Sequence, residues 1–180
     1  LFRSTIDAGQ LVMSFDVELD GSWSAISIAT GTIAAGYVEL IEHREGTGWL
    51  PGRLVELTKR WQPRTIVIDG GCGTAAAMLG EVRYAFEQAA LNTDRLQTLT
   101  TKDYRLACSA FLQAVIDGRV SRPSVENDRL ELAGLTARAR EVGDSWIFDR
   151  RKSPEPIVAI TTAAMARSQL AEPAFEFFLQ

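Results

Sequence analysis

Residues 11–21 read Leu-Val-Met-Ser-Phe-Asp-Val-Glu-Leu-Asp-Gly, and this stretch decides how the chain begins to fold. The apolar run that ends at Asp16 predicts a strand over 11–19, and Asp20 with Gly21 is a turn signal. Two more segments in which apolar and polar residues alternate follow, at 23–30 and 37–43. Three strands joined by short loops predict an antiparallel meander.

The rest of the chain changes between helical and strand patterns. A helix is expected from near Pro51 until Pro63, which closes it. Residues 65–69 (Thr-Ile-Val-Ile-Asp) are apolar up to the last residue, as in a strand buried on both faces. Short strands are expected at 96–100 and 146–148, and helices at 74–90, 102–117, 125–141 and 156–170. This order predicts an α/β domain of the ribonuclease H-like kind, with a mixed sheet (an antiparallel three-strand meander plus parallel strands) flanked by helices.

The chain has 180 residues, the size of one domain with a substantial core. We expect a single domain over 1–180, with a leading segment at 1–10 and a C-terminal tail at 171–180. The chain begins with Leu1 rather than Met, which indicates a domain excised from a longer protein. It has no apolar run of the roughly 18 residues that a membrane span needs. Its two cysteines are far apart in sequence, which favours a reduced, intracellular setting.

Carboxylates stand at the ends of two apolar strands. Asp16 ends the first run, Asp69 ends the run at 65–69, and further acids follow in the tract 146–159. A carboxylate beside aliphatic neighbours is costly to bury unless it is paired or bound to a metal. Carboxylate oxygens suit Mg²⁺ and Mn²⁺, and two such ions can clamp the attacking and leaving oxygens of a phosphodiester. The pattern therefore predicts a two-metal nuclease.

The charge distribution bears on whether DNA is the partner. The net charge of −4 argues mildly against nucleic acid, because phosphate-binding proteins usually carry a basic face. Bound metal ions would neutralise several acids, however. Basic residues are also dense near the acidic tract, at Arg138, Arg140, Arg150, Arg151 and Lys152. Of these, Arg150, Arg151 and Lys152 either contact DNA phosphates or form a solvated basic turn, and we favour phosphate contact.

Three tracts carry a resemblance to a known family. They are Phe15-Asp16-Val17-Glu18, Val67-Ile68-Asp69-Gly70, and Trp146-x-Phe-Asp-Arg-Arg151 followed by Glu155-Pro-Ile-Val-Ala-x-Thr161. Together they resemble the C-terminal nuclease domain of bacteriophage terminase large subunits, over about Val12 to Ala166. The resemblance implies a ribonuclease H-like fold and two-metal cleavage of double-stranded, concatemeric DNA during genome packaging. Such a site would contact the DNA backbone rather than base edges, so we expect low sequence specificity.

The resemblance also implies partners and a setting. The partners would be double-stranded DNA, the terminase small subunit and the portal of the procapsid, in the cytoplasm of the infected host and without a membrane. The ATPase motor of such proteins lies N-terminal to the nuclease. Nothing in this chain matches the G-x-x-x-x-G-K-[ST] phosphate loop of a motor, so we expect the nuclease part without the N-terminal ATPase domain.

Two residues compete to be the third carboxylate of the site. Family members usually place an aspartate where this chain has Glu155, just before the last helix. Glutamate can still bind a metal, although an acid at that point also complements the helix dipole. Asp149 is the competitor for the role. Glu18 shares a strand face with Asp16 and is interpreted as a solvated edge residue rather than an accessory ligand.

Three other functions remain open. Residues 67–74 (Val-Ile-Asp-Gly-Gly-Cys-Gly-Thr) resemble a glycine-rich phosphate loop, as in an actin-like or sugar-kinase-like ATP-binding domain, and ATP turnover without DNA cleavage would favour that function. A ribonuclease H-like domain without a metal site could serve as a non-catalytic assembly module for the portal. Failure to bind divalent ions would favour this second function. A junction resolvase has a related fold and would prefer branched DNA.

Overall fold

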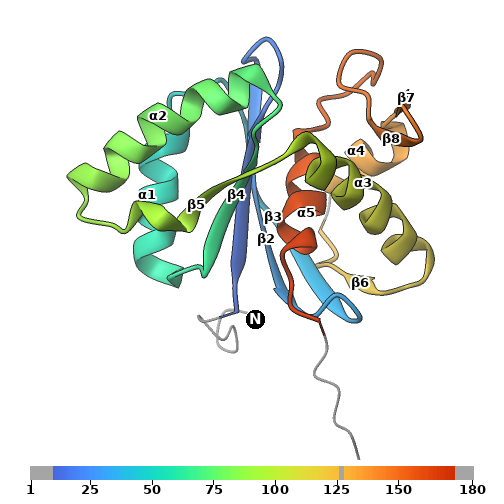
Figure 1. Ribbon diagram of the computed structural model, residues 1–180, viewed down its shortest axis with the longest axis horizontal. Coiled ribbons are helices and arrows are strands. Elements are labelled where there is room, and N and C mark those ends of the chain that lie inside the picture. Colours follow the sequence, from blue (N-terminus) through green and yellow to red (C-terminus); the bar gives the residue numbers. More distant parts are fainter. Residues whose placement is uncertain (1–9, 126–127, 173–180) are drawn as a thin grey trace, which may run out of the picture.

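A six-stranded mixed sheet forms the centre of the molecule (Figure 1). The computed structural model describes residues 10–125 and 128–172. The strands are β1 (Val12–Val17), β2 (Trp23–Gly31), β3 (Gly36–Glu45), β4 (Thr65–Asp69), β5 (Leu96–Leu99) and β6 (Val120–Ser121). They lie in the order β5-β4-β1-β2-β3-β6. β1, β2 and β3 form the expected antiparallel meander, and β4, β5 and β6 each pair in parallel with a neighbour, so the predicted mixed sheet is confirmed.

The pairing of β1 with β4 brings two strand ends to the same edge of the sheet. The two strands run parallel, with Ser14 opposite Val67. Every residue of both strands is buried, which explains their nearly unbroken apolar runs. Asp16 and Asp69 each lie two residues further along, so their carboxylates come to neighbouring positions at the carboxyl ends of the two strands.

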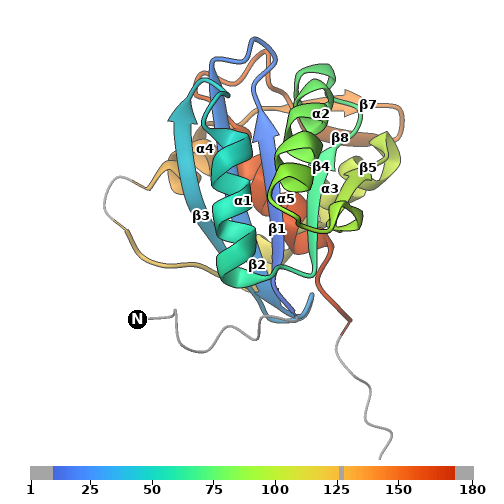
Figure 2. The same ribbon diagram turned by 90° about the vertical axis from the view of Figure 1, so that its left-hand side faces the viewer.

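Helices cover both faces of the sheet. They are α1 (Leu50–Trp61), α2 (Gly73–Gln88), α3 (Thr101–Ile116), α4 (Arg129–Thr136) and α5 (Val158–Ser168). α1 and α2 lie on one face, which is turned toward the viewer in Figure 2, and α3, α4 and α5 lie on the other. Alternate side chains of β1 serve the two cores: Met13 and Phe15 pack under α1 and α2, whereas Val12 packs under α5.

The helix predicted over 156–170 is confirmed as α5, which lies deep in the structure. Its small side chains allow it to pack closely against the sheet, and nearly all of them are buried. Hydrogen bonds tie it to the strands: for example, Ser14 Oγ donates to the Thr162 carbonyl oxygen at 2.6 Å, and the hydroxyls of Ser27 and Thr162 lie 2.7 Å apart. α5 therefore packs against β1 and β4.

The helix predicted over 125–141 is wrong in its second half. α4 ends at Thr136, and the chain then forms a hairpin of β7 (Ala139–Val142) and β8 (Ser145–Phe148). Gly143 has a φ of 60° and lies in the turn of this hairpin, whereas its position after an alanine- and arginine-rich run suggested a helix end. These short strands show no alternation of buried and exposed residues, so they carry no signal that competes with helix propensity.

Parts of three expectations fall outside the described residues. These parts are residues 126 and 127 of the predicted helix, residues 1–9 of the leading segment and residues 173–180 of the tail. The two-residue strand β6 was not predicted, because a segment so short carries no periodic pattern. Within 10–125 and 128–172, no helix is long and apolar enough to cross a membrane.

Candidate active site

The two strand-end aspartates are buried, and the backbone holds one oxygen of each. Asp16 is fully buried and Asp69 is nearly so. The Val17 amide donates to Asp16 Oδ1 at 2.8 Å, and the Gly71 amide donates to Asp69 Oδ1 at 2.8 Å. These bonds fix both carboxylates and leave their Oδ2 atoms for other partners.

A tight turn after β4 presents Asp69. A Cβ atom at Gly70 would lie 2.9 Å from the Leu99 carbonyl oxygen, closer than real Cβ contacts, so only glycine fits there without a shift of the backbone. Gly70 therefore allows the tight strand-to-helix turn that presents Asp69.

Arg150 joins the two aspartates. Its Nη2 lies 2.5 Å from Asp16 Oδ2 and 3.9 Å from Asp69 Oδ2, and its Nη1 donates to the Val17 carbonyl oxygen at 3.3 Å. The Arg150 side chain is only 8% exposed. The sequence placed this residue among the basic ones near the acids, but an ion pair between residues 134 positions apart leaves no local pattern.

The site strongly favours positive charge. Burial raises the pKa of Asp69, an effect that the Gly71 amide opposes and the nearby Asp16 carboxylate reinforces. Burial works to lower the pKa of Arg150, but the attraction of Asp16 and of other neighbours outweighs it, and this pKa is raised well above its usual range. Arg150 therefore stays charged and compensates the acids.

Thr161 is a site residue that sequence reasoning missed. It lies on α5, is fully buried, and its hydroxyl donates to Asp16 Oδ2. A threonine in a run of small residues looks like helix packing, and only the contact between α5 and β1 reveals its partner. Thr161 thus fixes the same Asp16 oxygen that Arg150 contacts.

Replacing Thr161 with valine should reduce the unfolding free energy by about 1–3 kcal/mol, because a buried carboxylate oxygen loses a donor. Urea unfolding measures this loss. Thr161→Ser keeps the hydroxyl and is expected to cost only about 0.8 kcal/mol for one methyl group. A valine variant as stable as the wild type would show that this hydrogen bond contributes nothing.

Glu18 is not the solvated edge residue that its sequence position suggested. It is only 8% exposed, and its Oε1 accepts a hydrogen bond from the Ile157 amide at 2.8 Å, directly before α5. Burial raises its pKa, while the charge of Arg150 opposes that rise. The residue is buried because the N-terminal end of α5 supplies a donor from a segment far away in sequence.

The structure places Asp149 and Glu155 differently from each other. Asp149 is 3% exposed, and its Oδ1 accepts bonds from the Arg151 and Lys152 amides at 3.0 and 3.2 Å. It therefore shapes the turn after β8. Glu155 is half-buried before α5. Among the described residues, no group of three or more acidic, histidine or cysteine side chains is arranged to hold a metal ion. The structure brings Asp16 and Asp69 together, and Asp149 lines the same cleft as Asp69 without joining them in such a group.

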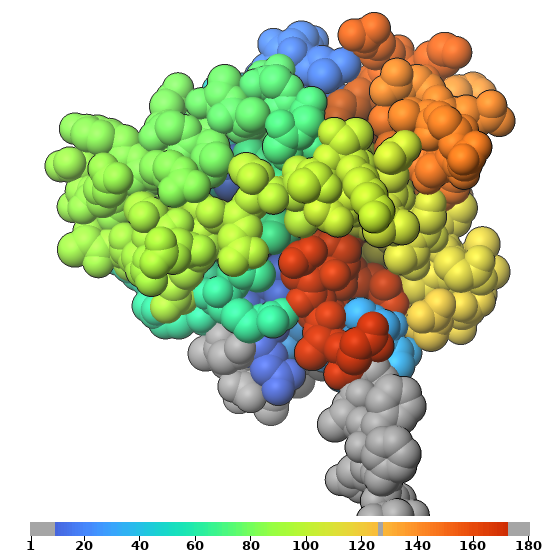
Figure 3. Space-filling view, in the orientation of Figure 1, coloured from blue at the N-terminus to red at the C-terminus, as the bar shows by residue number. Residues whose placement is uncertain are grey.

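A cleft of about 250 Å³ opens beside the aspartates, between α3 and the β7–β8 hairpin. In the space-filling view, α3 and this hairpin lie side by side on the surface (Figure 3). Asp69 lies on the wall of the cleft, as do four arginines: Arg105, Arg140, Arg150 and Arg151. Lys152, which is exposed, lies outside this lining. An acidic centre surrounded by arginines suits a polyanionic substrate that must approach carboxylates.

The donor atoms at the centre fit a divalent cation of the magnesium type. Carboxylate oxygens are the ligands such ions prefer. Asp16 and Asp69 direct oxygens toward one cationic group, the Arg150 guanidinium, and so have the arrangement that a bound cation would need. Two carboxylates are part of such a site, and a third ligand would have to move toward them.

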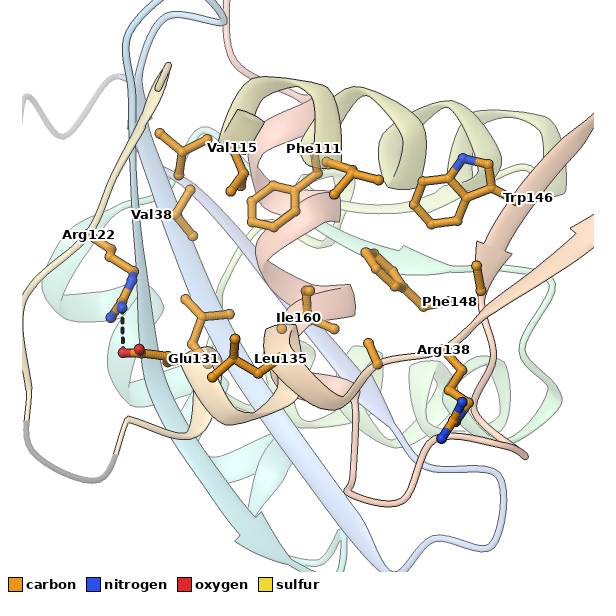
Figure 4. Close-up of a pocket in the computed structure, with 16 residues that line it drawn as sticks. Val38, Phe111, Val115, Arg122, Glu131, Leu135, Arg138, Trp146, Phe148 and Ile160 are labelled. Carbon is orange, nitrogen blue, oxygen red and sulfur yellow. Dashed lines mark hydrogen bonds and ion pairs between the residues drawn. The ribbon is translucent and has the colours of Figure 1, made fainter. Parts of the chain in front are cut away.

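A second, larger cavity has different chemistry. It measures about 610 Å³ and lies between α3, α4 and the β7–β8 hairpin. Figure 4 shows apolar side chains such as Phe111, Leu135 and Ile160 turned into it, with the ion pair of Arg122 and Glu131 at one end. Its lining has no pair of carboxylates, so the cleft beside Asp16 and Asp69 is the candidate active site.

Comparison with known proteins finds likeness in structure but not in sequence. No protein-family model and no curated protein matches the chain. Among solved structures, the large terminase nuclease from thermophilic phage G20c has 18% identity and a TM-score of 0.60, covering 89% of this chain and 81% of that one. The same nuclease with bound magnesium gives a TM-score of 0.59.

Two other phage nucleases are similar to this chain. The large terminase nuclease domain of Thermus phage P74-26 has 15% identity and a TM-score of 0.59, covering 93% of this chain and 83% of that one. A mutant nuclease domain of the large terminase subunit gp2 of bacterial virus Sf6, with manganese and beta-thujaplicinol, has 13% identity and a TM-score of 0.56, covering 92% and 90%. The chain therefore has the ribonuclease H-like fold of the phage large terminase nucleases.

Proposed function

We propose that this chain is a metal-dependent endonuclease that cleaves double-stranded DNA with low sequence specificity during viral genome packaging. The observation that carries the proposal is the buried pair of Asp16 and Asp69 around one cationic group, at the carboxyl ends of adjacent strands. The fold of the phage terminase nucleases supports it, because structures of two such nucleases hold magnesium or manganese.

The chain's own residues would divide the work as follows. Asp16 and Asp69 would hold two Mg²⁺ or Mn²⁺ ions, and Glu155 or Asp149 would complete the ligand set. When bound, such ions lower the pKa of a water and stabilise the charge on the leaving oxygen. Asp149 has one oxygen engaged by two backbone amides, so it would offer the other. Glu155 would need its longer side chain to reach the pair.

The basic side chains would bind the DNA backbone. We propose that Arg150, Arg151 and Lys152 contact phosphates, together with Arg140 of β7 and, on the other side of the cleft, Arg105 of α3. Contacts of this kind position a duplex without distinguishing bases, which is consistent with low sequence specificity. Terminase small subunit and portal would be the protein partners of the full assembly.

The arginines of the cleft can be tested through salt dependence. Replacing both Arg140 and Arg151 with glutamine should weaken duplex binding. The slope of log affinity against log salt should shrink by about 0.9 for each phosphate that the protein no longer neutralises, or roughly 2 in all. Fluorescence anisotropy of a labelled duplex without divalent ions measures the slope.

The matched control for this double variant is the exposed pair Lys59 and Arg60 on α1. Changing both to glutamine removes the same charge far from the cleft and should leave the slope unchanged. Equal slopes in the two double variants would contradict the assignment of the cleft arginines to phosphate binding.

A second candidate function is a non-catalytic assembly module of the same fold. It is favoured by one observation: Arg150 already compensates the buried acids, so the chain can fold without a metal. Supercoiled plasmid separates the two functions. The proposed nuclease nicks and linearises it with Mn²⁺ or Mg²⁺ and not with EDTA. The assembly module leaves it intact under all three conditions.

A further inference from the structure

We propose that Arg150 is an exchangeable counter-ion for Asp16 and Asp69. In the structure its guanidinium occupies the point toward which both carboxylates are directed. It must leave that point when a divalent ion binds, and it is then free to contact a DNA phosphate in the cleft. The proposal rests on the proposed function, because it assumes that these two aspartates are metal ligands.

The two oxygens of each carboxylate have different partners. Both Oδ1 atoms are held by backbone amides, of Val17 and Gly71. Both Oδ2 atoms approach the same guanidinium nitrogen of Arg150, at 2.5 and 3.9 Å. The Oδ2 atoms are therefore the pair that a shared cation would contact, and Arg150 occupies their meeting point.

Arg150 and a divalent ion would compete for one oxygen, Asp16 Oδ2. A magnesium-type ion needs carboxylate oxygen at about 2.1 Å. Asp16 Oδ2 already accepts bonds from both Arg150 and the Thr161 hydroxyl, so little of its surface remains. A guanidinium and a divalent ion on that oxygen would also repel each other strongly in so buried a place. Simultaneous occupation is therefore disfavoured.

Arg150 is held tightly at one point only, its contact with Asp16. The contact with Asp16 is short, the bond to the Val17 carbonyl is long at 3.3 Å, and the approach to Asp69 is an ion pair without a hydrogen bond. Asp149 fixes the turn that carries Arg150 through its bonds to the next two amides. Release can therefore be a rotation of the side chain, with the backbone unmoved.

After its release, the Arg150 side chain would add its charge to the cleft. Arg150 lines the cleft together with Arg105, Arg140 and Arg151, so a rotation outward adds its charge to that group. Metal binding would thereby raise the positive charge facing a phosphate. The exchange would therefore couple metal binding to DNA binding.

Isothermal titration of the 180-residue chain with Mn²⁺ tests the competition. Arg150→Gln should bind Mn²⁺ at least about tenfold more tightly than the wild type, because no competitor must leave. Arg60→Gln is the matched control: it removes the same charge from an exposed position on α1, away from the cleft, so its affinity should stay near the wild-type value. An affinity of Arg150→Gln that is equal to or weaker than that of the wild type would overturn the proposal.

A measurement on the unaltered chain decides the matter if Arg150→Gln does not fold. The ¹⁵N side-chain resonance of Arg150, assigned by comparison with Arg150→Lys, should shift and lose its protection from solvent exchange as Mg²⁺ is added. A resonance that stays protected at saturating Mg²⁺ would refute the exchange. Mn²⁺ binding that survives Asp16→Asn, or no binding by any form, would overturn the metal site and the exchange together. Binding that Asp16→Asn abolishes, with Arg150 unmoved, would overturn the exchange alone.

Discussion

Replacing Asp16 or Asp69 with asparagine is expected to reduce DNA cleavage by more than about 100-fold. Loss of a residue that only supports a metal ligand already costs up to about 100-fold, and these aspartates are proposed to contact the metal directly. An amide keeps the shape of the carboxylate but loses its charge and one of its two acceptor oxygens. Initial rates of plasmid nicking in saturating Mn²⁺ measure the effect.

The control for these variants is Asp144→Asn. Asp144 lies in the exposed turn of the β7–β8 hairpin, so its replacement removes the same charge without touching the paired acids. The cleavage rate of this variant should remain within about twofold of the wild type, as expected of a surface change away from the site. Circular dichroism establishes that each variant is folded. A folded Asp16→Asn that cleaves at the wild-type rate would contradict the assignment of the active site.

Replacing Arg150 with glutamine should lower the stability of the metal-free chain by about 3–5 kcal/mol, the usual cost of removing one partner from a buried ion pair. Asp16 would then be fully buried with an uncompensated charge. In a chain of this size, each kcal/mol lowers the melting temperature by about 2–4 °C, so the decrease should be roughly 10 °C.

Divalent ions should restore much of that stability. At a concentration of about 100 times the dissociation constant, a ligand that binds only the folded state adds about 2.7 kcal/mol. Differential scanning calorimetry with EDTA and then with Mn²⁺ measures both effects. Arg151→Gln, an exposed change, should stay within about 0.5 kcal/mol of the wild type. If Arg150→Gln melts at the wild-type temperature in EDTA, the buried pair does not hold the site together.

The sheet could be read from the sequence because its central strands have strong local patterns. The runs at Val12–Val17 and Thr65–Asp69 are apolar since helices cover both faces of the sheet there. An acid at the end of such a run stands out, so Asp16 and Asp69 were identifiable. Their proximity followed from the parallel pairing that the element order predicted.

The partners of those acids could not be read from the sequence. Arg150, Thr161 and the Ile157 amide reach Asp16 and Glu18 from the last third of the chain. Such contacts depend on how α5 and the turn after β8 are placed, and no spacing rule encodes them. The burial of Glu18 was missed for this reason.

The strand predicted at 146–148 is confirmed within β8, but its partner β7 was missed for a different reason. Ala139–Val142 is short and mostly exposed, so its residues show no alternation of buried and exposed positions. Residues that favour helices in isolation form a strand here because Ser145–Phe148 offers a partner across a two-residue turn. This hairpin forms one wall of the candidate cleft. The shape of the site therefore depends on an element that helix propensity argues against.

The central claim is that Asp16 and Asp69 hold the divalent ions on which DNA cleavage depends. The most direct measurement is anomalous scattering from a crystal of the chain soaked in Mn²⁺, with data collected near the manganese edge. We predict an anomalous peak within about 2.0–2.2 Å of carboxylate oxygens of both aspartates. A map with no peak at these oxygens under saturating Mn²⁺, or with its only peak elsewhere, would contradict the account.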